Sequence, residues 1–126
     1  MSTDELDILS KDGRTGRHPG ETVVLSAMWA LGRKPKEVEA RLFWFTQGRG
    51  IEDIMVVATQ AVPSPAEAGE QEFTFTLPEA PYSCAGQLVS IKWAVELVAD
   101  GEAARWEFTL GPEGREIALD SGGGTV

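Results

Sequence analysis

Few side chains in this sequence could perform chemistry, and they form no recognisable catalytic set. The only histidine, His18, lies in a loop-like segment, and the chain has no Gly-x-Ser-x-Gly motif that would present a nucleophile. A nucleophilic Cys84 would need exposure and a base, so this residue is expected to be a small buried side chain beside Tyr82. Two Cys or His side chains are too few for structural zinc, and the acidic pairs lack the ligand spacing of calcium sites. The sequence therefore predicts a protein that is not an enzyme and has no metal or cofactor.

One basic cluster stands out in the loop predicted over residues 11–20 (KDGRTGRHPG), where glycine and proline interrupt any regular structure. It contains Arg14, Arg17 and His18, with few acids nearby in the sequence. One interpretation is a solvated surface loop. The other is a loop that contacts an anion, because binding residues often lie on loops held by a rigid scaffold.

The charge of the chain limits its partners. The net charge is −9, and residues 61–126 carry three Lys/Arg against eleven Asp/Glu. Such acidity argues against binding to nucleic acid or to anionic lipid. No apolar run is long enough for a transmembrane helix and the N-terminus lacks a signal-peptide pattern, so we expect no membrane insertion and a cytoplasmic location. Residues 1–120 are expected to form a single domain, followed by a flexible tail over residues 121–126.

The elements that must position any site are strands, because apolar residues alternate with polar ones. The pattern is clearest over residues 73–97, where two alternating runs flank a Pro-rich connector and form the pair around which the sheet is organised. Residues 104–110 alternate too and form a hairpin with the preceding strand through the Asp100–Gly101 turn. Further strands are predicted over residues 22–31, 37–45 and 53–62, with loops over residues 46–50 and 63–72. The strand over residues 22–31 is apolar on both sides, which favours a central position with both faces covered.

This pattern predicts an all-β fold, an antiparallel sandwich of seven to eight strands. By alternation, all four tryptophans fall on the inner faces, where burial of large rings is most favourable: Trp29, Trp44, Trp93 and Trp106. If two of them were instead exposed and coplanar, they could form a platform for sugar rings.

The stretch over residues 73–97 resembles a pattern in arrestin-like domains. A strand ends at Pro78, a Pro-x-Ser connector with a glycine follows, and the next strand has the aromatic Trp93 between apolar residues; the residues that carry the resemblance are Phe73, Phe75, Leu77, Pro78, Pro81, Ser83, Gly86, Ile91, Trp93 and Val95. Cys84 stands where an aromatic residue is usual, and the chain has room for one sandwich instead of two. The resemblance implies an immunoglobulin-like β-sandwich of arrestin type with scaffold or adaptor work, and no catalytic residues.

Phe43 and Phe45 break the alternation, because they fall on a face that is polar earlier in the same strand. If this strand pairs with the strand of Trp93, the outer face of the sheet would show Arg41, Phe43 and Phe45 beside Lys92. An apolar patch ringed by charge is typical of a protein-contact surface. The alternative is that the N-terminal segment or the loop over residues 63–72 covers the two rings.

These observations together predict a protein-interaction module that binds a protein partner or itself. Contact would use the outer face around Phe43 and Phe45, or the addition of a strand to an open sheet edge. The alternative hypothesis is a sandwich that binds carbohydrate or another small ligand through the end loops over residues 11–20, 46–50 and 79–86.

Overall fold

The computed structural model describes residues 4–48, 52–86 and 89–119. The predicted flexible tail, residues 121–126, lies outside the described residues, as does the end of the predicted loop over residues 46–50. The strands are β1 (Glu5–Ser10), β2 (Gly16–Arg17), β3 (Thr22–Ala30), β4 (Val38–Gly48), β5 (Ile54–Ala61), β6 (Ala68–Thr76), β7 (Cys84–Gly86), β8 (Val89–Ala99), β9 (Glu102–Leu110) and β10 (Ile117–Leu119). One turn of 3-10 helix, Pro112–Gly114, precedes β10. No helix in the described part of the chain is long and apolar enough to cross a bilayer.

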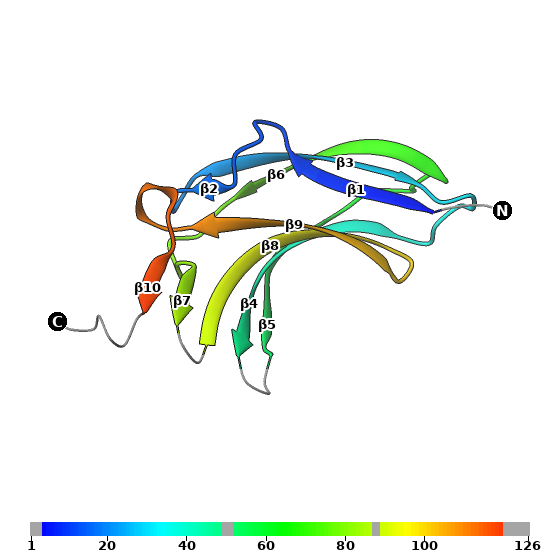
Figure 1. The fold of residues 1–126 in the computed structure, drawn as a ribbon. Helices are drawn as coiled ribbons and strands as arrows, with labels where there is room; N and C mark the ends of the chain where they lie inside the picture. Colours follow the sequence, from blue (N-terminus) through cyan, green and yellow to red (C-terminus); the bar gives the residue numbers. More distant parts are fainter. Residues whose placement is uncertain (1–3, 49–51, 87–88, 120–126) are drawn as a thin grey trace.

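The strands form two sheets that pack face to face. The smaller sheet has the order β1-β3-β6, and the larger has the order β10-β7-β8-β4-β5, with β9 paired to β8 on the side of β7 (Figure 1). Pairing between the long strands is antiparallel, whereas the short pairs β2–β9 and β7–β10 are parallel. The predicted antiparallel β-sandwich is confirmed, and seven of its strands have six residues or more.

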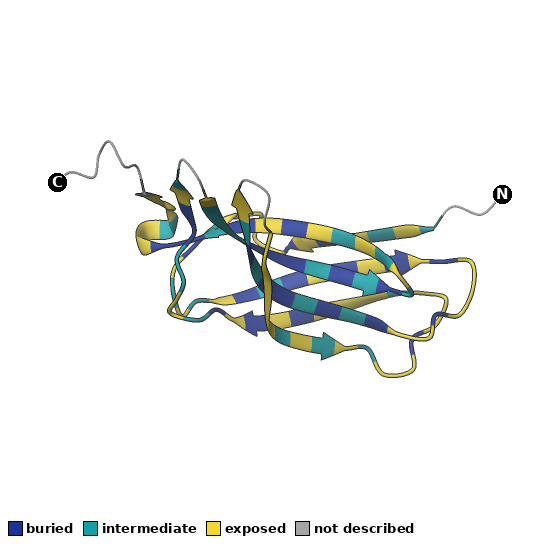
Figure 2. Ribbon diagram, turned by 90° about the horizontal axis from the view of Figure 1, so that it is seen from below, coloured by how far each residue is buried: buried dark blue, intermediate teal, exposed yellow. Residues whose placement is uncertain are grey.

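The core lies between the sheets and comes from alternate residues of the long strands (Figure 2). In β3, for example, Val23, Leu25, Ala27 and Trp29 are buried while the side chains between them are exposed or half-buried. Period-2 alternation of this kind lets one face of each sheet exclude water. The largest fully buried side chains include Trp93, Phe73, Leu25, Leu42 and Leu97.

Three predictions about elements are wrong in detail. The strands on either side of the Pro-rich connector do not pair, because β6 lies in the smaller sheet and β8 in the larger, so the connector crosses between sheets. β3 is central as predicted, but only one of its faces is covered, and Met28 is exposed. The predicted loops are shorter, since β4 continues to Gly48 and β6 begins at Ala68.

The hairpin between β8 and β9 is confirmed. Its turn residues Asp100 and Gly101 both have positive φ, of 48° and 91°, as a type I′ turn requires. The carboxylate of Asp100 also accepts the backbone N–H groups of Lys36 and Glu37 at 2.9 and 3.2 Å. The turn is thereby tied to the segment that leads into β4, the neighbour of β8.

Candidate functional site

The predicted pairing of the Phe43 strand with the Trp93 strand is present in the structure. In the β4–β8 register, Phe45 lies opposite Lys92, Phe43 opposite Ala94 and Arg41 opposite Glu96. These side chains therefore share one face, which we call the outer face: the side of the larger sheet turned away from the smaller one. It also receives Arg105 and Glu107 from β9 and Ile54 and Val56 from β5.

The two phenylalanine rings on this face are covered. Each is 2% exposed, and their centroids are 5.8 Å apart. The guanidinium of Arg105 lies over both rings, 5.0 Å from the centroid of Phe43 and 4.9 Å from that of Phe45. Such cation–π contacts are attractive because the ring faces are negative. The expectation of an exposed aromatic patch is therefore corrected: a cation of the same face caps the rings, while β1 and β6 lie with the smaller sheet on the other side.

The charges of the outer face balance one another. Arg41 bonds Glu39 at 2.6 Å, and Arg105 lies 3.4 Å from Glu96 and 3.9 Å from Glu107. With Lys92 included, three cations face three carboxylates. The excess negative charge of the chain thus lies elsewhere, and the outer face is close to neutral.

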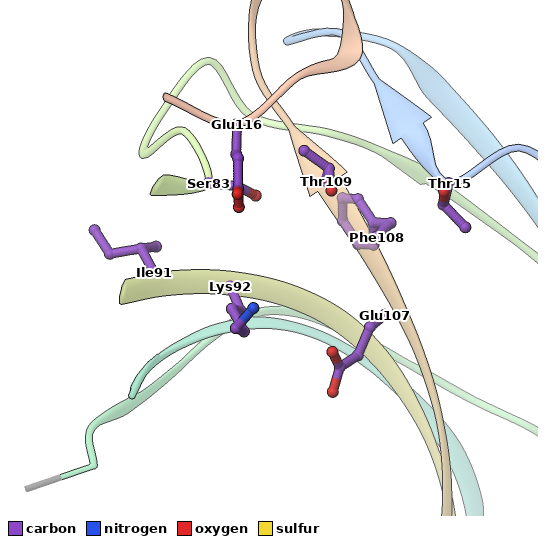
Figure 3. Close-up of a pocket in the computed structure, with 8 residues that line it drawn as sticks. All are labelled: Thr15, Ser83, Ile91, Lys92, Glu107, Phe108, Thr109 and Glu116. Atoms are coloured by element: carbon purple, nitrogen blue, oxygen red, sulfur yellow. The ribbon is translucent and has the colours of Figure 1, made fainter. Parts of the chain in front are cut away.

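Side chains of this face help to line two hollows. The first, about 180 Å³, is lined by Arg41, Phe43, Ile54, Val56, Glu96 and Arg105. The second, about 210 Å³, lies where β9 separates from β8 to pair with β2 (Figure 3). Its lining contains Lys92, two glutamates and Ser83, whose hydroxyl oxygen already accepts the backbone N–H of Leu110 at 2.9 Å. With that hydroxyl engaged and no histidine among the eight lining residues, the second hollow has no activated nucleophile.

Exposed apolar side chains gather beside the outer face on β5. Ile54, Met55, Val56 and Val57 are 55, 54, 47 and 44% exposed. Among the described residues β5 is the last strand of its sheet, so no strand pairs with its outer edge. The sequence predicts a strand here and shows its four consecutive apolar residues, but it does not show that the strand lies at an edge, because the order of strands in a sheet follows from long-range pairing. The absence of any charge over residues 54–62 was the available signal.

The basic cluster of the loop over residues 11–20 is neutralised within the structure. Arg17 is 1% exposed, and its guanidinium bonds Asp12 at 2.6 Å and Glu21 at 2.8 Å. The hydrogen bond from Arg17, with further help from the N–H of Arg14, lowers the pKa of Asp12 to about 2. Arg14 stands 4.0 Å from Asp12 and 3.8 Å from Glu21, and His18 is exposed. Arg17 is therefore not available for the predicted contact with an anion, because its guanidinium already bonds two carboxylates.

The connector residues that carry the family resemblance have structural roles. The indole N–H of Trp93 donates to the backbone carbonyl of Pro81 at 2.7 Å. Ser83 bonds Leu110 through its hydroxyl and its backbone N–H, at 2.9 and 2.6 Å, and so closes the end of β9. Cys84 is 4% exposed, in agreement with the expected buried side chain.

The remaining candidates for ligand chemistry are weak among the described residues. Trp29, Trp93 and Trp106 are buried and Trp44 packs partly against the core, so no exposed pair forms a sugar platform. The loops named for small-ligand binding are shortened by β4 and β7. No group of three or more His, Cys, Asp or Glu side chains in the described part could hold a metal ion.

Comparison with known proteins gives likeness in structure only. No protein-family model matches the sequence, and no curated protein matches it. The sporulation control protein Spo0M from Bacillus subtilis is similar with a TM-score of 0.62 at 16% identity, over 89% of this chain. A β-glucosidase from Listeria innocua is similar with a TM-score of 0.50 at 11% identity, over 89% of this chain. The matched regions span 51% of the Spo0M chain and 17% of the β-glucosidase chain, so what is shared is the fold of one part of each.

Proposed function

We propose that this chain is a non-enzymatic protein-binding module of the cytoplasm, which contacts its partner through the outer face and the adjoining edge of β5. The observation that carries the proposal is the exposed apolar run Ile54 to Val57, of which Ile54 and Val56 lie on the nearly neutral outer face. Apolar patches rimmed by polar groups mark contact surfaces, because the release of water from an apolar surface on binding is favourable.

The arrangement of the outer face supports this role. Ile54, Val56 and Phe43 line a hollow together with the charged side chains Arg41, Arg105 and Glu96. An apolar centre with a polar, ion-paired rim is the usual anatomy of a protein interface. The resemblance of the connector to arrestin-like domains implies scaffold or adaptor work, which fits a module that acts by contact.

Substitution of an exposed apolar residue tests this proposal better than substitution of the rings. Loss of a buried phenylalanine side chain costs about 3–5 kcal/mol, so Phe43→Ser or Phe45→Ser would unfold the surface as well as alter it. Ile54→Asp instead places a charge at an exposed side chain that lines the hollow. Met28→Asp is the matched control, because Met28 is 43% exposed on the smaller sheet.

The measurement is affinity capture from the native host with quantitative mass spectrometry, followed by direct titration of the purified partner. We expect Ile54→Asp to lose the captured partner at least about tenfold, which corresponds to about 1.4 kcal/mol of binding free energy, and Met28→Asp to keep it. Equal capture by both variants would contradict the proposed surface. Turnover in a broad substrate screen, abolished by His18→Ala, would contradict the non-enzymatic role.

A further inference from the structure

The free edge of β5 has backbone groups ready to pair with another strand. The carbonyl of Asp53 accepts the N–H of Thr46 at 2.9 Å, so Asp53 directs its backbone toward β4. Neighbouring residues of a strand direct these groups in opposite directions within the sheet. Ile54 and Val56 therefore point their N–H and C=O groups to the free edge, where the described residues provide no neighbouring strand.

This edge lacks the protection that the other edges carry. β1 has Glu5 and Asp7, and β6 has Glu70 and Glu72. Charged side chains on an edge discourage pairing with another chain, as do prolines and very short strands. β5 has eight residues, IMVVATQA, without a charge or a proline. Its register shift lies beyond Val56, so residues 54–56 stay in regular pairing with β4.

We propose that two copies of this chain associate edge to edge through β5, antiparallel, about a two-fold axis at Met55. This inference rests on the proposed function and specifies the partner as a second copy. Closed homo-dimers commonly use one self-complementary surface, and a strand that pairs with itself in antiparallel fashion is such a surface.

Charge favours a second copy at this place. Two molecules that each carry −9 repel one another except where their surfaces are neutral. The strand β5 is uncharged, and the outer face beside it has its carboxylates paired with Arg41 and Arg105. A different protein that bound this acidic chain through complementary positive charge would not bind at β5, because β5 has no charged side chain.

The edge-directed residues specify the register. With Met55 on the axis, Ile54 of one copy pairs with Val56 of the other, and both direct their backbone groups into the new interface. Asp53 then faces Val57, so no carboxylate of this strand opposes another. A shift of the axis to Val56 would pair Ile54 with Ala58, which directs its backbone to β4 beyond the register shift. In the Met55 register the two outer faces lie on the same side, and the Ile54 and Val56 side chains of both copies form one apolar strip across the new interface.

A disulfide at the axis tests the register. Residues facing each other in a non-hydrogen-bonded antiparallel pair have Cα atoms about 4.5 Å apart, within the range of a disulfide. Met55→Cys should therefore form a covalent dimer under mild oxidation. Thr59→Cys is the matched control on the same strand, because the two Thr59 residues would lie about 27 Å apart, eight residues at about 3.4 Å each. The wild-type chain controls for Cys84, which is buried.

The second measurement is mass in solution by light scattering across a range of concentrations. We expect a dimer for the wild type, a monomer for Val56→Lys, and a dimer for the control Met28→Lys. Circular dichroism and urea unfolding of each variant establish that it folds. The inference is overturned if the wild type is monomeric, if Val56→Lys leaves the dimer intact, or if Thr59→Cys cross-links as fast as Met55→Cys. A monomer whose partner capture is still lost in Ile54→Asp would overturn the second copy while leaving the proposed function standing.

Discussion

The buried guanidinium of Arg17 offers the sharpest test of how this sandwich is held together at one end. Arg17 makes hydrogen bonds to Asp12, Glu21 and the carbonyl of Arg14, and it lies 5.6 Å from the ring centroid of Trp106. Its backbone is part of β2, which pairs with the end of β9. Arg17→Ala therefore removes two ion pairs and the contact of the guanidinium with the Trp106 ring of β9.

The expected cost follows from burial. Removal of one partner from a fully buried ion pair costs about 3–5 kcal/mol, whereas an exposed pair contributes about 0–1 kcal/mol. The Arg17 side chain is 2% exposed, but those of Asp12 and Glu21 are 45% and 19% exposed, so water can solvate the carboxylates once the cation is gone. We expect Arg17→Ala to lower the free energy of unfolding by about 2–4 kcal/mol. Arg17→Lys keeps the charge but loses the planar guanidinium that bonds both carboxylates. Its free energy of unfolding should therefore lie between those of Arg17→Ala and the wild type.

Urea unfolding followed by tryptophan fluorescence measures this loss. Arg14→Ala is the control, because Arg14 stands beside the same carboxylates but its side chain is 57% exposed. We expect its cost to stay below about 1 kcal/mol. Equal losses for Arg17→Ala and Arg14→Ala would refute the role assigned to the buried guanidinium.

The pH dependence of stability tests the pairing of Arg17 with Asp12 and Glu21 independently. The pKa of Asp12 is about 2 in the folded chain, held below its ordinary value first by the hydrogen bond from Arg17. For Glu21, burial raises the pKa, but bonds from the His18 N–H and from Arg17 outweigh it and the net shift is downward. A carboxyl with a depressed folded pKa stabilises the fold above its unfolded pKa, and this contribution is lost as pH falls through the folded value. The stability gap between wild type and Arg17→Ala should therefore narrow from about pH 4 to pH 2; a gap that widens would contradict the pairing.

Two further substitutions test the corner where β9 ends. Ser83→Ala leaves the buried N–H of Leu110 without its 2.9 Å acceptor and should cost about 1–3 kcal/mol in urea unfolding, whereas the exposed control Ser26→Ala should change stability by less than about 0.5 kcal/mol; equal effects would contradict the assigned hydrogen bond. Gly111→Ala would place a Cβ atom 1.9 Å from the backbone oxygen of Arg115, so the turn before β10 must move, at a cost of about 1–3 kcal/mol measured as a lower thermal midpoint. An unchanged midpoint would show that the close approach is not required.

Part of this molecule could be predicted from the sequence because the information is local. Alternation along β3, β4, β8 and β9 identifies which side chains enter the core, and the Asp100–Gly101 pair marks a turn with positive φ. The pairing of β4 with β8 was also predicted, and with it the part of the outer face that Arg41, Phe43, Phe45 and Lys92 form, but not the part that β5 contributes. It followed from the family resemblance together with that alternation.

The alternation of apolar and polar residues along single strands does not show which charged side chains cover the outer face or surround Arg17. Arg105 covers Phe43 and Phe45 only because β9 folds back beside β8, three strands away from β5 in the sheet. Asp12 and Glu21 are only five and four residues from Arg17 in the sequence, but apolar–polar alternation does not show that this loop folds around the guanidinium and pairs it with both carboxylates.

The sequence by itself determined that this chain folds as a sandwich, because side chains point to opposite faces at every step along a strand and burial selects one of those faces. The tertiary structure decided which sheet each strand joins and which strand stands at an edge. Those choices depend on pairing between residues distant in the chain, and they leave the uncharged run over residues 54–57 as the longest run of exposed large apolar side chains among the described residues.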